Sequence, residues 1–217
     1  DTFERPIVAN ADQLFIVTAL ADPTPRMGMI DRILVAAFDA RIDPVLCLTK
    51  ADLASPDELR AAYDPLGVPI LVTDPEADLT AITEALTDRV TVFVGHSGVG
   101  KSTLVNRLIP GAGRATAEVS ELTGKGRHTS TSAIAMELPG GGWIIDTPGV
   151  RSFGISHVQT ASILGAFPDL AEIAEDCPRG CSHITGVIEC ALDDAVAAGR
   201  LSPERLASFR RMGRAFV

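Results

Sequence analysis

Residues 93–106 read FVGHSGVGKSTLVN, and residues 95–102 fit the phosphate-binding pattern G-x-x-x-x-G-K-[ST] at every fixed position. The apolar run 90–94 predicts a buried strand before this loop, and residues 101–108 predict a helix after it. Glycines let the backbone approach phosphate oxygens closely, so N–H groups at the helix N-terminus can point at an anion. The alternative is a glycine-rich turn that precedes a helix by chance, but strand, loop and helix all agree with phosphate binding.

Two side chains of this loop have predicted chemical roles. Lys101 supplies positive charge to the β- and γ-phosphates, and Ser102 supplies a hydroxyl ligand for Mg²⁺. The predicted phosphate-binding residues are Gly95, His96, Ser97, Gly98, Val99, Gly100, Lys101, Ser102 and Thr103, together with Gly149 from a later motif.

The composition is that of a soluble globular protein, with 46% hydrophobic and 22% charged residues and no apolar run of membrane-spanning length. A chain of 217 residues can bury one full core and add a small appendage. The net charge of −9 argues against a surface that binds nucleic acid everywhere. The chain begins at Asp1 without a methionine or an export signal, so we expect a cytoplasmic protein that lacks an N-terminal piece.

Short apolar strands alternate with helical stretches, which predicts an α/β fold with a mostly parallel sheet and helices on both faces. The expected strands are 14–20, 45–48, 70–73 and 90–94, the expected helices are 27–40, 56–63, 78–88 and 101–108, and 133–138 and 143–145 form a hairpin. Beyond residue 156 the sequence changes to short helices around a Cys/His cluster. We therefore expect a junction with the first strand at 1–20, a nucleotide-binding domain at 21–156 and a helical metal-binding domain at 157–217.

The sequence Asp146-Thr147-Pro148-Gly149 ends the second strand of the predicted hairpin. A carboxylate at Asp146 can hold Mg²⁺ through water, and the Gly149 N–H can contact a γ-phosphate, so hydrolysis would release the loop that follows. D-x-x-G alone is common in turns. In a chain with a phosphate loop it predicts a nucleotide switch.

Residues 49–52, Thr-Lys-Ala-Asp, match the guanine-reading pattern [NT]-K-x-D. A carboxylate at Asp52 can accept from N1–H and the 2-amino group of guanine, and adenine offers neither donor. The stem of Lys50 would cover the base. An ordinary strand-to-helix turn is the alternative, but the motif ends a predicted strand and uses one of only three lysines in the chain. The predicted guanine-binding residues are Thr49, Lys50, Asp52, Leu53 and, through a backbone N–H near it, Thr73.

The position of this base-reading motif is unusual. In ordinary GTPases it follows D-x-x-G, yet no lysine occurs here beyond residue 125. The motif must therefore precede the phosphate loop, and the order of the motifs along the chain is rotated.

Together these segments resemble the circularly permuted, ribosome small-subunit-dependent GTPases of the RsgA (YjeQ) family. The segments that carry the resemblance are LTKADL at 48–53, GHSGVGKSTL at 95–104, GRHTST at 126–131, DTPGVRSFG at 146–154 and a later Cys/His cluster. The resemblance covers nearly the whole chain. It implies a circularly permuted P-loop GTPase that hydrolyses GTP, with Mg²⁺, in late maturation of the small (30S) ribosomal subunit. It also implies that the small ribosomal subunit and its rRNA are partners. The N-terminal OB-fold that family members usually carry is largely absent from this sequence. We expect the chain to be a monomer.

The resemblance gives Thr129 the place of the switch I threonine, which would reach Mg²⁺ and the γ-phosphate. Ser130 and Thr131 are alternatives by one-residue slips, and a flexible Thr-rich loop is another. After D-x-x-G the chain has Val150, which cannot hydrogen-bond water, so another group must orient the nucleophile or intrinsic turnover is slow. The predicted catalytic residues are His128 and Thr129, with His96 as a second candidate for the water-orienting role, and the predicted Mg²⁺ ligands are Ser102, Thr129 and Asp146.

Residues 177–190 hold the pattern Cys177-x3-Cys181-x-His183-x6-Cys190. Three thiolates and an imidazole make a closed tetrahedral set, typical of a structural zinc site. A disulfide or buried free thiols are the alternatives. Cys47 lies inside an apolar strand and is expected to be plain core.

Residues 200–217 contain five arginines against one acid, Glu204. They form either a solvated helix face or an RNA-facing patch on an otherwise acidic molecule. Two other functions remain open: a nucleotide-controlled binding module with negligible turnover, which Val150 would allow, and an ATP-using P-loop kinase.

Overall fold

The computed structural model describes residues 10–112, 134–146 and 163–214. By their contacts these residues form two compact units. Unit 1 contains residues 10–25, 42–56, 69–112 and 134–146, and unit 2 contains residues 26–41, 57–68 and 163–214. Each unit is described by itself below.

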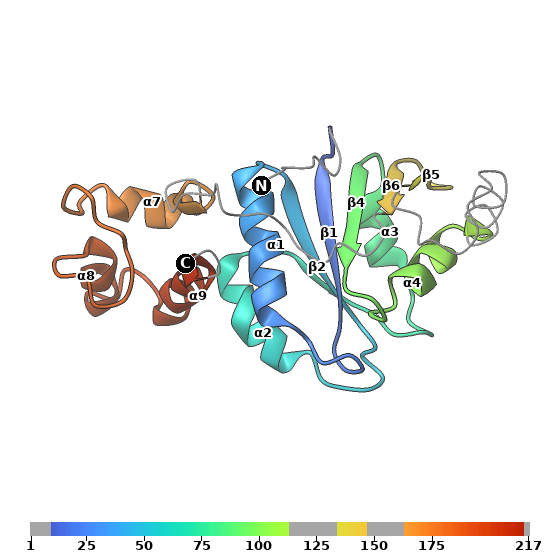
Figure 1. The fold of residues 1–217 in the computed structure, drawn as a ribbon, viewed down its shortest axis with the longest axis horizontal. Coiled ribbons are helices and arrows are strands. Elements are labelled where there is room, and N and C mark those ends of the chain that lie inside the picture. Colours follow the sequence, from blue (N-terminus) through green and yellow to red (C-terminus); the bar gives the residue numbers. More distant parts are fainter. Residues whose placement is uncertain (1–9, 113–133, 147–162, 215–217) are drawn as a thin grey trace, which may run out of the picture. The chain divides into compact units, whose positions relative to one another are not determined.

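Unit 1 is built on a six-stranded sheet with the order β3-β2-β1-β4-β6-β5 (Figure 1). The strands are β1 (Gln13–Ala19), β2 (Asp43–Thr49), β3 (Ile70–Val72), β4 (Val90–Gly95), β5 (Ile134–Glu137) and β6 (Trp143–Asp146). Neighbouring strands pair in parallel, except that β5 and β6 form an antiparallel hairpin. The mostly parallel sheet and the hairpin expected from the sequence are both confirmed.

The central strand β1 is buried along its whole length, as expected for a parallel strand with both faces covered. Phe15 of β1 stacks on Phe93 of β4 with ring centroids 4.7 Å apart. Helices α3 (Thr80–Leu86) and α4 (Lys101–Leu108) add Ile82, Leu86, Leu104, Val105 and Leu108 to the same core cluster. This core holds β1 and β4 firmly, so the loops that follow them have fixed starting points.

The strand register places three strand ends at one edge of the sheet. Ala19 at the end of β1 is paired with Thr49 at the end of β2, and Val17 of β1 is paired with Gly95 at the end of β4. In open parallel sheets, ligands bind beyond the carboxyl ends of the strands. The predicted base-reading motif follows β2 and the phosphate loop follows β4, so both lie at this edge.

Unit 2 is helical. It contains α1 (Met27–Asp39), α2 (Asp57–Tyr63), the 3₁₀ turn η1 (Asp64–Leu66), α7 (Pro168–Ala174), α8 (Ala191–Ala197) and α9 (Pro203–Gly213). Helix α9 begins after Ser202, whose hydroxyl accepts from the Arg205 N–H, and it contacts α1, α2 and η1. In the described part of the chain, no helix combines the length and apolar character needed to cross a membrane.

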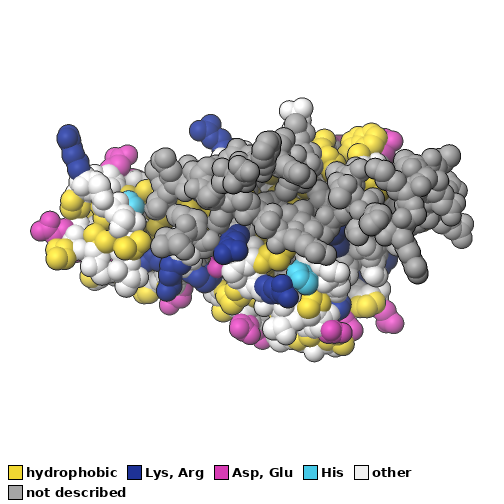
Figure 2. Space-filling view, in the orientation of Figure 1, with side chains coloured by type: hydrophobic (Ala, Val, Ile, Leu, Met, Phe, Trp, Pro, Cys, Tyr) yellow, Lys and Arg dark blue, Asp and Glu magenta, His cyan; other side chains and the backbone are white. Residues whose placement is uncertain are grey.

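Three of the five arginines for which the sequence left open a solvated helix face or an RNA-facing patch form ion pairs within unit 2. Arg205 donates two bonds to the Asp169 carboxylate, Arg210 pairs with Asp193, and Arg211 pairs with Asp31. This geometry is against both an RNA patch and a simple solvated face for these three side chains. Across the described face in Figure 2, basic and acidic side chains are interspersed, so neither charge dominates it.

Three expected helices differ slightly in their bounds, and the first of them, α1, ends at Asp39 rather than at residue 40. Helix α2 begins at Asp57, one residue after Pro56. Helix α3 begins at Thr80 and ends at Leu86, inside the expected range 78–88. The Asp78 carboxylate accepts from the N–H and hydroxyl of Thr80, so Asp78 lies before the helix and satisfies an N–H of the first turn that has no partner within the helix.

The pair between Arg211 and Asp31 generates a stability prediction. Asp31 is 3% exposed, and Arg211 also donates to the Ala62 carbonyl at 3.0 Å. Arg211→Ala leaves a buried carboxylate without its cation, which should lower the free energy of unfolding by about 2 kcal/mol, less than for a fully buried pair because Arg211 is partly exposed. Urea denaturation measures this, and Arg60→Ala is the control, since its exposed pair with Asp64 should change stability by less than about 0.5 kcal/mol. Equal effects of the two variants would contradict the prediction.

Candidate functional site: a phosphate loop and a base-reading motif at one sheet edge

The phosphate loop has the backbone that its glycines predict. Strand β4 ends at Gly95 and helix α4 begins at Lys101, so residues 96–100 form the turn between them. A Cβ at Gly95 would lie 2.5 Å from the Val17 carbonyl oxygen, so no larger residue fits there. Gly100 precedes the helix at φ +86°, in the left-handed region that favours glycine. Ser102 and Thr103 lie exposed in the first turn of α4, where the helix N-terminus favours an anion.

Thr49 joins the predicted base-reading motif to this loop. Its hydroxyl donates to the carbonyl of Val99 at 2.6 Å, and the carbonyl of Thr18 lies 3.2 Å away. Thr49 is 5% exposed and lies beside Gly100, where an added Cβ would be 3.6 Å from its hydroxyl oxygen. The role of Thr49 is therefore to position the phosphate loop relative to the motif.

The turn after β1 lies against both motifs. The Lys50 ammonium donates to the Asp22 carbonyl, and Lys50 has a left-handed backbone with φ +59°. A Cβ at Gly98 would lie 3.7 Å from Pro23. No motif in the sequence marks this turn as part of the site. The contact of this turn with the two motifs depends on the order of strands in the sheet, which no local pattern encodes.

Lys101 and Asp146 form an ion pair between the start of α4 and the end of β6. Their side chains are only 11% and 24% exposed. The predicted phosphate-binding ammonium and the predicted Mg²⁺-binding carboxylate therefore lie together, although they are 45 residues apart in the chain. Both groups lie where α4 begins and β6 ends.

On the base side, the loops after β2 and β3 are hydrogen-bonded to each other, because the Ala51 N–H donates to the Thr73 carbonyl at 3.2 Å. Asp52 is exposed, and Leu53 is 56% exposed, unusual for a leucine and suited to contact with a flat base. The Thr73 N–H donates to the Leu48 carbonyl at 2.8 Å. Thr73 is thus a poor candidate for a guanine contact through its own N–H, since that donor completes the sheet.

Arg107 is a residue of this site that sequence reasoning missed. It lies on α4 and donates to the carbonyls of Asp74 and Ala77, which holds the loop after β3 against the helix that follows the phosphate loop. The Asp74 carboxylate accepts from the Glu76 and Ala77 N–H groups, both at 2.8 Å. No sequence pattern signalled this contact. A basic residue near a helix C-terminus is common, because it interacts favourably with the helix dipole, so Arg107 did not stand out.

Several predicted site residues lie outside the described residues: His128, Thr129, Gly149, and the alternatives Ser130, Thr131 and Val150. His96 is described, and its Nδ1 lies 2.8 Å from the Ser97 carbonyl oxygen. The catalytic or switch roles of all these residues, His96 included, stay predictions.

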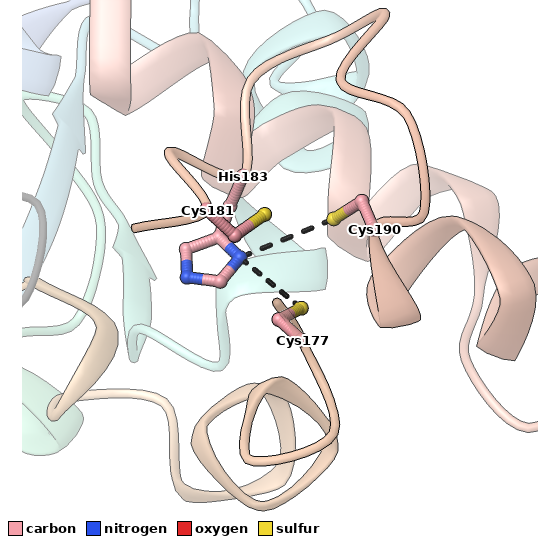
Figure 3. A group of neighbouring side chains, drawn as sticks. All are labelled: Cys177, Cys181, His183 and Cys190. Carbon is pink, nitrogen blue, oxygen red and sulfur yellow. Dashed lines mark hydrogen bonds between the residues drawn. The ribbon is translucent and has the colours of Figure 1, made fainter. Parts of the chain in front are cut away.

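The four residues of the Cys/His cluster come together in unit 2. Their ligand atoms all lie within 4.8 Å of one another, and Figure 3 shows the side chains gathered around a common centre. The His183 Nδ1 lies 3.6 Å from the Cys177 sulfur and 3.9 Å from the Cys190 sulfur. All four cysteines of the chain are free thiols, which is against the disulfide alternative. The donor set fits a metal ion, since three thiolates and an imidazole can complete a tetrahedral shell.

Burial shifts the pKa of His183 in the cluster and the pKa of Cys47 in β2. Burial, and second the Arg210 charge, lower the pKa of His183, which favours the neutral imidazole that a metal requires. In β2, burial raises the pKa of the Cys47 thiol to about 12, so Cys47 is an inert core residue.

Comparison with known proteins agrees with this geometry. The model of the RsgA GTPase family matches residues 1–156. A protein of Azotobacter vinelandii named "Small ribosomal subunit biogenesis GTPase RsgA" is 43% identical over 96% of this chain and 63% of its own length. A Pseudomonas aeruginosa protein of the same name is 41% identical over the same shares.

Two solved structures have the same fold. The crystal structure of YjeQ from Thermotoga maritima superposes with a TM-score of 0.71 at 27% identity, covering 96% of this chain and 72% of that one. YloQ, described as a circularly permuted GTPase, superposes with a TM-score of 0.68 at 28% identity, covering 95% and 68%. The rotated order of motifs is thus confirmed as a circular permutation.

The chain spans about 63% of the length of the curated relatives it matches. Its family model nevertheless covers most of the chain, including both motifs and the sheet edge that carries them. The chain belongs to the RsgA GTPase family.

Proposed function

We propose that this chain binds guanine nucleotide with Mg²⁺ and hydrolyses GTP as a step in maturation of the small ribosomal subunit, in the cytoplasm. The observation that carries the proposal is the bond from the Thr49 hydroxyl to the Val99 carbonyl, which puts a base-reading motif beside a phosphate loop. The names of its relatives, small ribosomal subunit biogenesis GTPases, support the ribosomal part.

In this proposal the phosphates lie on the backbone N–H groups of residues 95–103. Lys101 leaves Asp146 and pairs with the β- and γ-phosphates, while Asp146, Ser102 and Thr129 hold Mg²⁺. Mg²⁺ supplies charge stabilisation when bound. The exchange of partners by Lys101 and Asp146 requires only short side-chain movements, because their ion pair lies at the loop itself.

Guanine lies against Lys50 and Leu53 and donates to Asp52. The loop after β3, held by Arg107, supplies a backbone contact from a residue other than Thr73. A site built around the Asp52 carboxylate rejects ATP, since adenine leaves that carboxylate unpaired. This argues against an ATP-using kinase.

His128 orients the attacking water, and Thr129 contacts Mg²⁺ and the γ-phosphate only while GTP is bound. Gly149 couples loss of that phosphate to the chain beyond it, where the nucleotide-binding domain at 21–156 gives way to the metal-binding domain at 157–217. The small ribosomal subunit and its rRNA order the switch and raise the rate.

Multiple-turnover GTP hydrolysis with and without purified small ribosomal subunits tests this function. We expect a slow intrinsic rate, because Val150 cannot orient water, and stimulation by the subunits. No turnover in either condition, with GTP still bound, would favour a nucleotide-controlled binding module instead.

We also propose that the Cys/His cluster, Cys177, Cys181, His183 and Cys190, holds a structural Zn²⁺. Four protein ligands leave no open position for substrate, so this ion stabilises unit 2 and takes no part in hydrolysis.

Asp52→Asn should weaken GDP binding by about tenfold to a hundredfold, because charged hydrogen bonds to the base are lost. It should strengthen binding of xanthosine diphosphate, whose additional oxygen accepts a bond from the new amide. Competition against a fluorescent guanine nucleotide measures both changes. The control is Glu58→Gln, which removes an exposed acid six residues further along the chain and should leave both affinities unchanged. Equal competition by ADP and GDP in the wild type would refute the base-reading assignment.

Metal removal gives a second prediction. The purified chain should contain one zinc ion, and a chelator should make Cys177 and Cys181, whose side chains are partly exposed, reactive toward iodoacetamide. Cys47 should stay unreactive until the sheet unfolds, because it is 0% exposed. Mass spectrometry of the alkylated chain identifies the sites. Cys181→Ser should lose zinc while the matched Cys47→Ala variant keeps it, and zinc retention by both would contradict the assignment.

A further inference from the structure

The backbone around the metal-binding cluster is held in uncommon conformations. His183 has φ +57°, and Glu189, directly before Cys190, has φ +61°. Non-glycine residues rarely adopt this left-handed region, and they persist there only when surrounding contacts determine it. Two of the four ligands therefore depend on support from other parts of unit 2.

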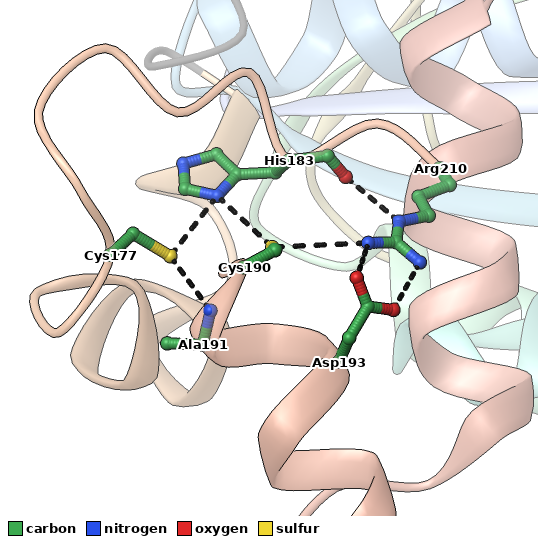
Figure 4. Close-up of polar contacts among 6 residues, drawn as sticks. All are labelled: Cys177, His183, Cys190, Ala191, Asp193 and Arg210. Atoms are coloured by element: carbon green, nitrogen blue, oxygen red, sulfur yellow. Dashed lines mark hydrogen bonds and ion pairs between the residues drawn. The ribbon is translucent and has the colours of Figure 1, made fainter. Parts of the chain in front are cut away.

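Arg210 of α9 supplies such support at both ligands (Figure 4). Its Nε donates to the His183 carbonyl at 2.8 Å, which fixes the peptide that carries the imidazole. Its Nη2 lies 3.8 Å from the Cys190 sulfur. The Arg210 side chain is only 11% exposed, so these contacts are largely shielded from water.

Asp193 fixes the orientation of the Arg210 guanidinium. Nη1 and Nη2 of Arg210 donate to the two carboxylate oxygens of Asp193, each at 2.7 Å. A bidentate pair of this kind sets the plane of the guanidinium as well as its position. Asp193 lies in the first turn of α8, and its N–H donates to the Cys190 carbonyl at 2.9 Å. The pair therefore connects α9 to the helix that begins directly after Cys190.

The same helix start supports another ligand. The Ala191 N–H donates to the Cys177 sulfur at 3.2 Å. Three thiolates and one Zn²⁺ together carry a net charge of −1, and the Arg210 guanidinium, which is also paired with Asp193, offsets part of that charge at the edge of the cluster. A lysine could balance the charge but has no planar fork with which to hold Asp193 and the His183 carbonyl together.

We infer that Arg210 is a positioning residue of the metal centre, which holds His183 and Cys190 in their ligating arrangement and is itself oriented by Asp193. The inference rests on the zinc assignment proposed above. It gives α9 a role in metal retention, although no residue of that helix is a ligand.

The test uses the whole 217-residue chain in four forms: wild type, Arg210→Gln, Arg210→Lys and Arg205→Gln. Arg205 is the matched control, since it lies on the same helix and makes the same kind of bidentate pair, with Asp169, without touching the cluster. Zinc affinity is measured by competition with a chromophoric chelator. The absorption spectrum of the Co²⁺-substituted chain reports the ligand geometry.

Arg210→Gln should weaken zinc binding by about 10- to 100-fold, the usual effect of removing a group that supports a metal ligand. It should also shift or broaden the Co²⁺ bands. Arg210→Lys should recover part of the affinity through its charge, and Arg205→Gln should bind zinc as the wild type does, even if it melts at a lower temperature.

Wild-type affinity in Arg210→Gln, or an equal loss of affinity in Arg205→Gln, would overturn the inference while leaving the zinc assignment in place. A wild-type chain that binds no zinc would overturn both. Should Arg210→Gln fail to fold, Asp193→Asn keeps the arginine and weakens only its orientation. It should then show a smaller loss of zinc affinity, and wild-type affinity in Asp193→Asn would overturn the inference.

Discussion

The parallel pairing of β2, β1 and β4 is the constraint on which the proposed nucleotide site depends. Parallel strands end at the same edge of a sheet, so the turns after these three strands meet although they are far apart in the chain. The Thr49 hydroxyl then fixes the contact by donating to Val99 in the phosphate loop. Circular permutation changes the order in which the strands are synthesised but leaves this edge intact, which is why a rotated sequence can retain the site.

Unit 2 illustrates a different use of long-range contacts. Its last helix, α9, carries three arginines that pair with Asp169, Asp193 and Asp31. One of these pairs holds α7, one lies beside the metal-binding cluster, and one holds α1. Helix α9 thus connects segments that the nucleotide-binding motifs separate along the chain. These three basic side chains therefore form ion pairs within unit 2 instead of adding free positive charge to its surface.

The sequence predicted what is determined locally. The bounds of α4, the hairpin of β5 and β6, and the clustering of three cysteines with His183 all follow from residues within short segments. Helix ends were predicted less accurately, because they depend on individual contacts such as the bond from Thr80 to Asp78 just before α3. The partners of Arg211 and Arg107 could not be predicted from the sequence. Arg211 and Asp31, for example, are 180 residues apart, and no pattern connects them. The Thr73 N–H donates to the Leu48 carbonyl on another strand, a contact that no local pattern shows.

A crystal structure of the chain with Mg²⁺ and GDP tests the central claim, that the rotated base-reading motif and the phosphate loop form one guanine nucleotide site. The account predicts the phosphates on the N–H groups of residues 95–103 and Lys101 turned from Asp146 toward the β-phosphate. It predicts the Asp52 carboxylate about 3 Å from N1 and the 2-amino group of guanine. Phosphates in the loop with the base bound away from Asp52 would contradict it, because Thr49 to Asp52 would then be only a turn.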